Sequence, residues 1–248
     1  MDPGAHPVAL IVALAEEARG VARQLAPSAV SSPHLAIWTG HIEDVPVVLV
    51  VSGVGKVAAA LATQFVCDVY HPRCAITFGL AGATESHSQT GRLIIASGAV
   101  QHDMDARPLT EARGVIPSLG TAIFAADEKL SKGLWAATEQ IAADPELVAA
   151  GLVLTGDQIV TSRAMRDALL QEFPMGLCFD METAAVAQAA QQNGIPWAAL
   201  RMTSDSADES FDLDHVISFG INTAADLFDQ VIRAFLVGQP AFDNPGRL

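Results

Sequence analysis

The chain has 248 residues, a length at which a single hydrophobic core is still possible, and half of its residues are apolar. Its formal net charge is −14. Because such a surface repels phosphate groups, neither a nucleic acid nor a membrane is an expected partner. Only 17% of the residues are charged, which indicates that another subunit covers part of the surface.

The cysteine and histidine patterns argue against disulfides and metal sites. Three cysteines are scattered through apolar runs, which is typical of reduced thiols in a cytoplasmic protein. No CxxC motif occurs, and no two histidines have ligand spacing, so neither a metal nor another cofactor is expected. Residues 1–20 lack the basic start of a signal peptide, and no apolar run approaches the roughly 20 residues of a membrane helix. We therefore expect a cytoplasmic protein.

Apolar stretches of strand length alternate with stretches of helical periodicity along the whole chain. The predicted strands are residues 8–14, 45–51, 74–78, 93–100, 152–154, 177–180 and 195–204. The predicted helices are residues 16–25, 57–70, 125–143, 163–173, 183–193 and 221–237. This alternation predicts one three-layer α/β domain spanning 1–248, with a core of about 8–237 and a frayed tail from Gly238.

Two turns rich in small residues follow predicted strands. Ser52-Gly53-Val54-Gly55-Lys56 superficially suggests a phosphate loop, but the upstream glycine of that motif is absent, and Val57 replaces its serine or threonine. The second turn, 79–83, would let a ligand approach the backbone or would only allow close packing. Taken alone, each turn fits a tight connection as well as a binding site.

Acidic residues stand after several strands, where ligands gather in sheets of this kind. Glu17 begins a helix, where it could simply complement the helix dipole. Glu182 precedes a small, apolar helix, and a carboxylate there is a natural acceptor for sugar hydroxyls. Asp205 ends the strand that contains Arg201 and could merely cap a turn. Arg201 needs either an acidic partner or a polar site, because an unpaired buried charge is very costly.

Together and in this order, the motifs resemble the nucleoside phosphorylase/nucleosidase superfamily, and most closely its 5′-methylthioadenosine/S-adenosylhomocysteine nucleosidases. The resemblance runs from Val8 to about Ile232. Its matching segments are residues 15–17, 52–60, 79–82, 102–105, 155–157, 180–182 and 201–205. The resemblance implies a nucleoside phosphorylase-like α/β/α fold with a central twisted mixed sheet.

The resemblance also implies that the chain hydrolyses the N-ribosyl bond of an adenine nucleoside. Asp205 would protonate the leaving base, Glu17 would activate water, and Arg201 would help to place that water. Such an acid–base pair suits cleavage through a cation-like sugar. The residues implied in substrate binding are Glu182 and Met181 at the ribose, Val160 and Ile159 at the adenine, and Ser204, Leu80, Ala81, Gly82, Phe211 and Pro117 elsewhere in the site.

Members of this group are homodimers, in which a loop of the neighbouring subunit closes the 5′ end of the substrate site. The loop after His102, including Pro117, is expected to have this role here. Phe211 is expected to line the same alkylthio pocket from its own subunit.

The sequence departs from the family pattern at the site. Leu80 stands where a serine hydroxyl usually helps to fix the water, Ile159 replaces an aromatic that stacks on the purine, and Asp180 replaces a frequent glutamate. Thr77 replaces the arginine with which related phosphorylases bind phosphate, so water is the expected nucleophile. The alternatives are a nucleosidase for another 5′-substituted nucleoside, such as futalosine or one of hopanoid synthesis, a phosphate-dependent phosphorylase, and a non-catalytic nucleoside-binding protein.

Overall fold

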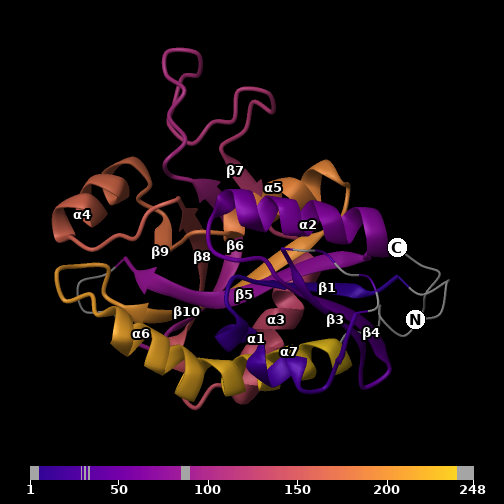
Figure 1. The fold of residues 1–248 in the computed structure, drawn as a ribbon. Coiled ribbons are helices and arrows are strands. Elements are labelled where there is room, and N and C mark those ends of the chain that lie inside the picture. Colours follow the sequence, from indigo (N-terminus) through magenta and orange to yellow (C-terminus); the bar gives the residue numbers. More distant parts are fainter. Residues whose placement is uncertain (1–5, 29, 31, 33, 85–89, 239–248) are drawn as a thin grey trace.

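The computed structural model describes residues 6–28, 30, 32, 34–84 and 90–238 (Figure 1). Of the tail that was expected to fray, only Gly238 lies within these residues. Within the described ranges, no helix is both long and apolar enough to cross a membrane.

The centre of the molecule is a mixed β-sheet, whose strands run in the order β10-β6-β8-β9-β5-β1-β4-β3-β2. Strand β5 also pairs with β10, and β7 pairs with β6. The strands are β1 (Val8–Val12), β2 (Ala26–Pro27), β3 (Ala36–Ile42), β4 (Val45–Val51), β5 (Cys74–Ala83), β6 (Leu93–Gln101), β7 (Ile123–Ala125), β8 (Val148–Thr155), β9 (Gly176–Asp180) and β10 (Trp197–Asp205).

Helices cover both faces of this sheet, with α1, α3 and α7 on one side and α2 and α5 on the other (Figure 1). The helices are α1 (Ala15–Ala22), α2 (Lys56–Tyr70), α3 (Glu128–Ile141), α4 (Arg163–Glu172), α5 (Thr183–Gln192), α6 (Leu213–Phe219) and α7 (Ala225–Val237). A 3₁₀ turn covers Pro145–Leu147, and a π-helical segment, Gly220–Ala224, joins α6 to α7. The predicted three-layer fold with a mixed sheet is therefore confirmed.

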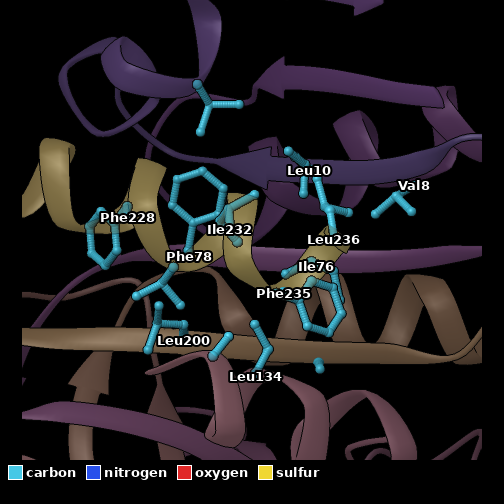
Figure 2. Close-up of a cluster of buried hydrophobic side chains, with 14 of the residues drawn as sticks. Val8, Leu10, Ile76, Phe78, Leu134, Leu200, Phe228, Ile232, Phe235 and Leu236 are labelled. Atoms are coloured by element: carbon cyan, nitrogen blue, oxygen red, sulfur yellow. The ribbon is translucent and has the colours of Figure 1, made fainter. Parts of the chain in front are cut away.

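The larger of the apolar cores lies between the sheet and α7 (Figure 2). Helix α7 presents Phe228, Ile232 and Phe235 at helical spacing, and all three are buried. Phe78 of β5 packs against Phe228 with ring centroids 5.4 Å apart. This packing fixes β5 and its neighbours β1 and β10, the strands from which the site is built.

Parallel pairing brings the ends of several strands to one edge of the sheet. Strand β1 pairs in parallel with β4 and with β5, and β5 pairs in parallel with β10. The segments that follow these strands therefore meet: Glu17 after β1, residues 52–56 after β4, residues 79–82 of β5, and Asp205 of β10.

The element boundaries differ from the sequence prediction in several places. Strands β2 and β3 and helix α6 were not predicted, and Ala125, the predicted first residue of a helix, is instead the last residue of strand β7. Helix α3 begins at Glu128 because the Asp127 side chain accepts a hydrogen bond from Leu130 N at 2.9 Å, as an N-cap does. The first strand stops at Val12, since Leu14 N donates to the Glu17 carboxylate at 3.0 Å and α1 begins at Ala15.

Candidate active site

A cavity of about 300 Å³ opens at the edge where these strand ends meet. The predicted site residues that line it are Glu17, Leu80, Ala81, Gly82, Ile159, Val160, Met181, Glu182, Ser204, Asp205 and Phe211. Arg201 and Pro117 are the two predicted residues that do not line it.

Glu17 is a buried carboxylate held by backbone amides. Oε1 accepts a hydrogen bond from Leu80 N at 2.9 Å, and Oε2 accepts one from Leu14 N at 3.0 Å. Burial raises the pKa of Glu17 above its usual value, while the Leu80 amide and the charge of Arg201 act in the opposite direction. A carboxylate that is fixed in direction and raised in pKa is suited to accept a proton from water near neutral pH.

Arg201 lies beneath the cavity wall and is only 1% exposed. Its Nη2 atom is 2.8 Å from Oδ2 of Asp180, and its Nε donates to the Thr183 hydroxyl at 2.9 Å. Of the two possibilities that the sequence left open, the structure has the ion pair with an acid. The departure at Asp180 therefore matters more than the sequence suggested, because Asp180 is the counter-charge of a fully buried guanidinium.

Glu182 connects the cavity to the first glycine-rich turn. Its Oε1 accepts a hydrogen bond from Gly55 N at 2.8 Å. Burial, and next the negative charge of Asp180, raise the pKa of Glu182 to about 7. Among the described residues, the Glu182 carboxyl group accepts this one side-chain hydrogen bond, so it has capacity for the vicinal hydroxyls of a sugar.

The turn that superficially suggested a phosphate loop has another role. Gly53 and Gly55 have φ angles of +84° and +101°, a backbone conformation that favours glycine, so the tight-turn interpretation is confirmed. Lys56 N donates to Asp157 Oδ1 at 2.7 Å, and Lys56 Nζ lies 2.7 Å from Asp103 Oδ1. The amides and the ammonium that would hold a phosphate are therefore engaged by carboxylates.

Asp205 stands at the carboxyl end of β10 and is half-buried. Ser204 Oγ donates to Oδ2 at 2.8 Å, and Ala207 N donates to Oδ1 at 2.8 Å. The carboxyl group is thus oriented on both oxygens by the chain on either side of it, and it lines the same cavity as Glu17 and Glu182.

The described side chains that line the cavity include four charged ones, and all four are carboxylates: Glu17, Asp180, Glu182 and Asp205. Arg201 is paired with one of them, Asp180, and lies below the surface of the cavity. Thr77, at the position of the phosphorylase arginine, is 1% exposed and accepts a hydrogen bond from Arg201 Nη2 at 3.3 Å. An anion in this cavity would therefore meet charges of its own sign.

One wall of the cavity was largely missed by the sequence prediction. Leu213, Val216 and Ile217 of α6 line it, and Phe179 of β9 lies deeper. The signal for α6 was present: Asp212 is an N-cap, its side chain accepting from Asp214 N at 3.0 Å, and the apolar residues follow at helical spacing. Ile159 faces the cavity and is 52% exposed, so the position where an aromatic was expected has open space beside it.

Pro117 does not line the cavity of its own chain and belongs to the segment between β6 and β7. This segment, residues 102–122, forms an arm whose loops project from the body of the molecule (Figure 1), while His102 and Ile116 within it are buried. Pro117 is exposed, and so are Leu109 (78%) and Leu119 (37%). The expected role of Pro117 concerns the site of a second subunit and stays a prediction.

Comparison with known proteins identifies the family to which this fold belongs. The model of the phosphorylase superfamily matches residues 7–236. The chain therefore belongs to the phosphorylase superfamily, as the order of its motifs predicted.

Several nucleosidases are similar to this chain. The 5′-methylthioadenosine/S-adenosylhomocysteine nucleosidase of Oceanobacillus iheyensis is 31% identical over 199 residues, which cover 79% of this chain and 85% of the relative. The crystal structure of the enzyme of that name from Neisseria meningitidis, in complex with methylthio-immucillin-A, has a TM-score of 0.84 and 29% identity, covering 93% and 98% of the two chains. The futalosine hydrolase of Helicobacter pylori has a TM-score of 0.82 over 94% and 98% of the chains, but only 22% identity.

Proposed function

We propose that this chain hydrolyses the N-ribosyl bond of an adenine nucleoside with a 5′-alkylthio substituent, such as 5′-methylthioadenosine or S-adenosylhomocysteine, and releases adenine. The observation that carries the proposal is the set of carboxyl groups around one cavity: Glu17, Glu182 and Asp205 face the same space, each with a different environment. Cleavage of such a bond needs an acid at the leaving group and a base at water.

In this mechanism Asp205 protonates the purine, so that the base leaves as a neutral molecule. Glu17 takes the proton of the attacking water, which adds to the anomeric carbon of the cation-like sugar. Glu182 accepts hydrogen bonds from the ribose hydroxyls, with the backbone of Met181 beside it. Arg201 acts on Glu17 from below the cavity and is a positioning residue.

Water is a better nucleophile than phosphate for this site. The described side chains that line the cavity include four acidic groups and no cation, so a phosphate dianion would meet no counter-charge there. The amides and the ammonium of residues 55–56 are engaged by Glu182, Asp157 and Asp103. For the same reason, the site disfavours a nucleoside whose 5′ substituent is an anion.

The choice of a 5′-alkylthio group rests on the wall made by α6 and on the relatives. Leu80, Phe211, Leu213 and Ile217 offer an apolar surface, against which a thioether can be buried. Relatives at about 30% identity are named as nucleosidases for 5′-methylthioadenosine and S-adenosylhomocysteine. The likeness to futalosine hydrolase is one of fold.

We further propose that the chain acts as a cytoplasmic homodimer. The outer face of α2 exposes Val57 (70%) and Leu61 (65%), beside the exposed Val54 (52%) of the preceding turn. The projecting arm, residues 102–122, would reach the site of the second subunit and bring Pro117 to its 5′ end. The three cysteines are buried and free, as in proteins of a reducing compartment.

The proposal is tested by offering the purified protein 5′-methylthioadenosine, S-adenosylhomocysteine, adenosine, inosine and futalosine, and by quantifying the free base with and without phosphate. A matched pair of 5′-thioadenosines, one propylthio and one carboxymethylthio, tests the role of charge at the 5′ end. We expect adenine to be released from 5′-methylthioadenosine without phosphate, and the propylthio compound to be preferred.

Strict dependence on phosphate would show a phosphorylase instead. Faster release from futalosine than from the thioadenosines would favour the alternative substrate. Tight binding of an adenine nucleoside without turnover would point to a non-catalytic binding protein. Sedimentation equilibrium tests the dimer, with Leu61→Glu as the variant expected to dissociate it.

A further inference from the structure

The turn after β10, residues 205–208, fixes the proposed acid. The amide of Ala207 donates to Asp205 Oδ1 at 2.8 Å, and Ala207 itself has an unusual backbone conformation, with a φ angle of +49°. A residue other than glycine in this conformation is strained and persists only where its surroundings hold it. The direction of the Asp205 carboxyl group therefore depends on whatever holds this turn.

A buried arginine of α4 contacts this turn. Arg166 is 3% exposed, and its Nη1 donates to the carbonyl oxygen of Ser206 at 3.3 Å. Its Nε donates to Asp167 Oδ1 at 3.1 Å. Since a charged group is buried only where polar partners repay the loss of hydration, the carbonyl of Ser206 is a structural partner and not an incidental neighbour.

A second arginine of α4 pairs with the same turn. Asp208 is 5% exposed, and Nε of Arg163 lies 3.6 Å from its Oδ2. Hydrogen bonds from Ser210, followed by the charges of Arg163 and Arg166, lower the pKa of Asp208. Helix α4 thus contacts the turn on both sides of Ala207, through Arg166 at the carbonyl of Ser206 and through Arg163 at the carboxylate of Asp208.

Helix α4 begins directly after residues that line the cavity. Ile159 and Val160 line the cavity, and Ser162 caps α4 by accepting a hydrogen bond from Met165 N at 3.3 Å. Val160, Leu169 of α4 and Ala207 belong to one apolar cluster. The helix therefore joins the wall expected to face the adenine to the turn that holds the acid.

We propose that Arg166 is a positioning residue for Asp205: its guanidinium group holds the turn at residues 206–208, which in turn aims the carboxyl group at the purine. The inference rests on the proposed function, in which Asp205 is the general acid. Arg166 lies on α4, a helix that contains none of the matching sequence segments. Through α4, the proposal connects the cavity wall at Ile159 and Val160 to the turn that holds Asp205.

The test compares Arg166→Met, which keeps the apolar stem, with Arg166→Lys, which keeps a charge able to reach the carbonyl of Ser206. We expect Arg166→Met to lower kcat by roughly 10- to 100-fold, because small displacements of a catalytic group reduce rates strongly, while KM stays nearly unchanged. Arg166→Lys should recover part of this loss. Gln171→Met is the control: Gln171 is exposed on the same helix and has no contact with the turn at residues 205–208 among the described hydrogen bonds, so kcat should stay near that of the wild type.

A double-mutant cycle with Asp205→Asn separates positioning from general destabilisation. If Arg166 acts through Asp205, Arg166→Met lowers the single-turnover rate of Asp205→Asn far less than it lowers that of the wild type. Equal losses in both backgrounds, or a wild-type kcat for Arg166→Met, would overturn the inference. Urea unfolding of each variant checks that the fold is retained, and Arg166→Lys carries the test if Arg166→Met does not fold.

Failure of the proposed function is recognised separately, because the wild-type protein would then release no base from any nucleoside. In that case, crystal structures of the wild type and Arg166→Met still decide the inference. A displaced Asp205 carboxyl group in the variant would support it, and an unchanged turn at residues 205–208 would overturn it.

Discussion

The carboxylate of Glu17 and the guanidinium group of Arg201 approach each other over the backbone of Gly79. A Cβ atom at this glycine would lie 2.6 Å from Glu17 Oε1 and 2.6 Å from Arg201 Nη1. Both groups are fixed from behind, Glu17 by the amides of Leu14 and Leu80, and Arg201 by Asp180. The bare backbone of Gly79 is therefore a requirement of the proposed base and its neighbour.

Gly79→Ala should displace Glu17 or Arg201 and lower kcat by about 100-fold, because neither group can move aside without losing its partners. We also expect the free energy of unfolding to fall by about 1–3 kcal/mol from overpacking. Adenine release and urea unfolding measure the two effects. Gly40→Ala on β3 is the control, since its added methyl group would meet the flexible end of Leu25 at 3.1 Å and the Leu25 Cα atom at 3.7 Å, an ordinary contact distance. A wild-type kcat for Gly79→Ala would contradict this account of the site.

Asp205→Asn tests the proposed acid directly. The amide keeps the size of the side chain and can still accept from Ala207 N, but it cannot deliver a proton to the purine. We expect kcat to fall by roughly 10²- to 10⁴-fold, the range typical of general acid catalysis. Binding of a non-hydrolysable nucleoside analogue, measured by calorimetry, should change much less. Asp214→Asn, at an exposed position of α6, should keep wild-type kcat, and near-normal turnover of Asp205→Asn would exclude the acid role.

The meeting of several acidic side chains at one edge of the sheet could be predicted from the sequence. Glu17, Glu182 and Asp205 each follow a strand that hydrophobic patterning identifies, and parallel pairing then brings these ends together. The partner of Arg201 could not be predicted, because β9 and β10 are not neighbours in the sheet and their spatial relation depends on tertiary structure. Helix α6 was missed because it spans only seven residues, Leu213–Phe219, which is shorter than the window over which helical periodicity is recognised.

The buried carboxyl group of Glu182 should make the stability depend on pH. Its pKa is raised to about 7 by burial and by the charge of Asp180, so the folded protein holds this proton more tightly than the unfolded chain does. The corresponding stabilisation is fully present below the ordinary value of about 4.5 and is lost as the pH rises through about 7. Glu182→Gln removes this contribution, because the amide does not ionise.

The free energy of unfolding of Glu182→Gln, relative to the wild type, should therefore increase between pH 5 and pH 8, by about 3 kcal/mol at most. Urea unfolding at several pH values measures this difference. Glu16→Gln, which changes an exposed carboxyl group next to Glu17, should give no such increase. A constant difference between Glu182→Gln and the wild type across this range would mean that Glu182 ionises in the folded protein as it does in the unfolded chain.

Ile159 offers a test of how this chain binds the base. The side chain lines the cavity and is half-exposed, so a larger ring can be accommodated there without displacing a buried neighbour. Ile159→Phe should lower KM for the adenine nucleoside by roughly 2- to 10-fold, because an aromatic face stacks on the purine with about 0.5–1.5 kcal/mol beyond simple burial. Ile159→Leu, which adds no π-face, should leave KM unchanged. If both variants shift KM equally, the side chain at this position contributes only apolar surface, and the purine is held by the backbone at Val160 and by Asp205.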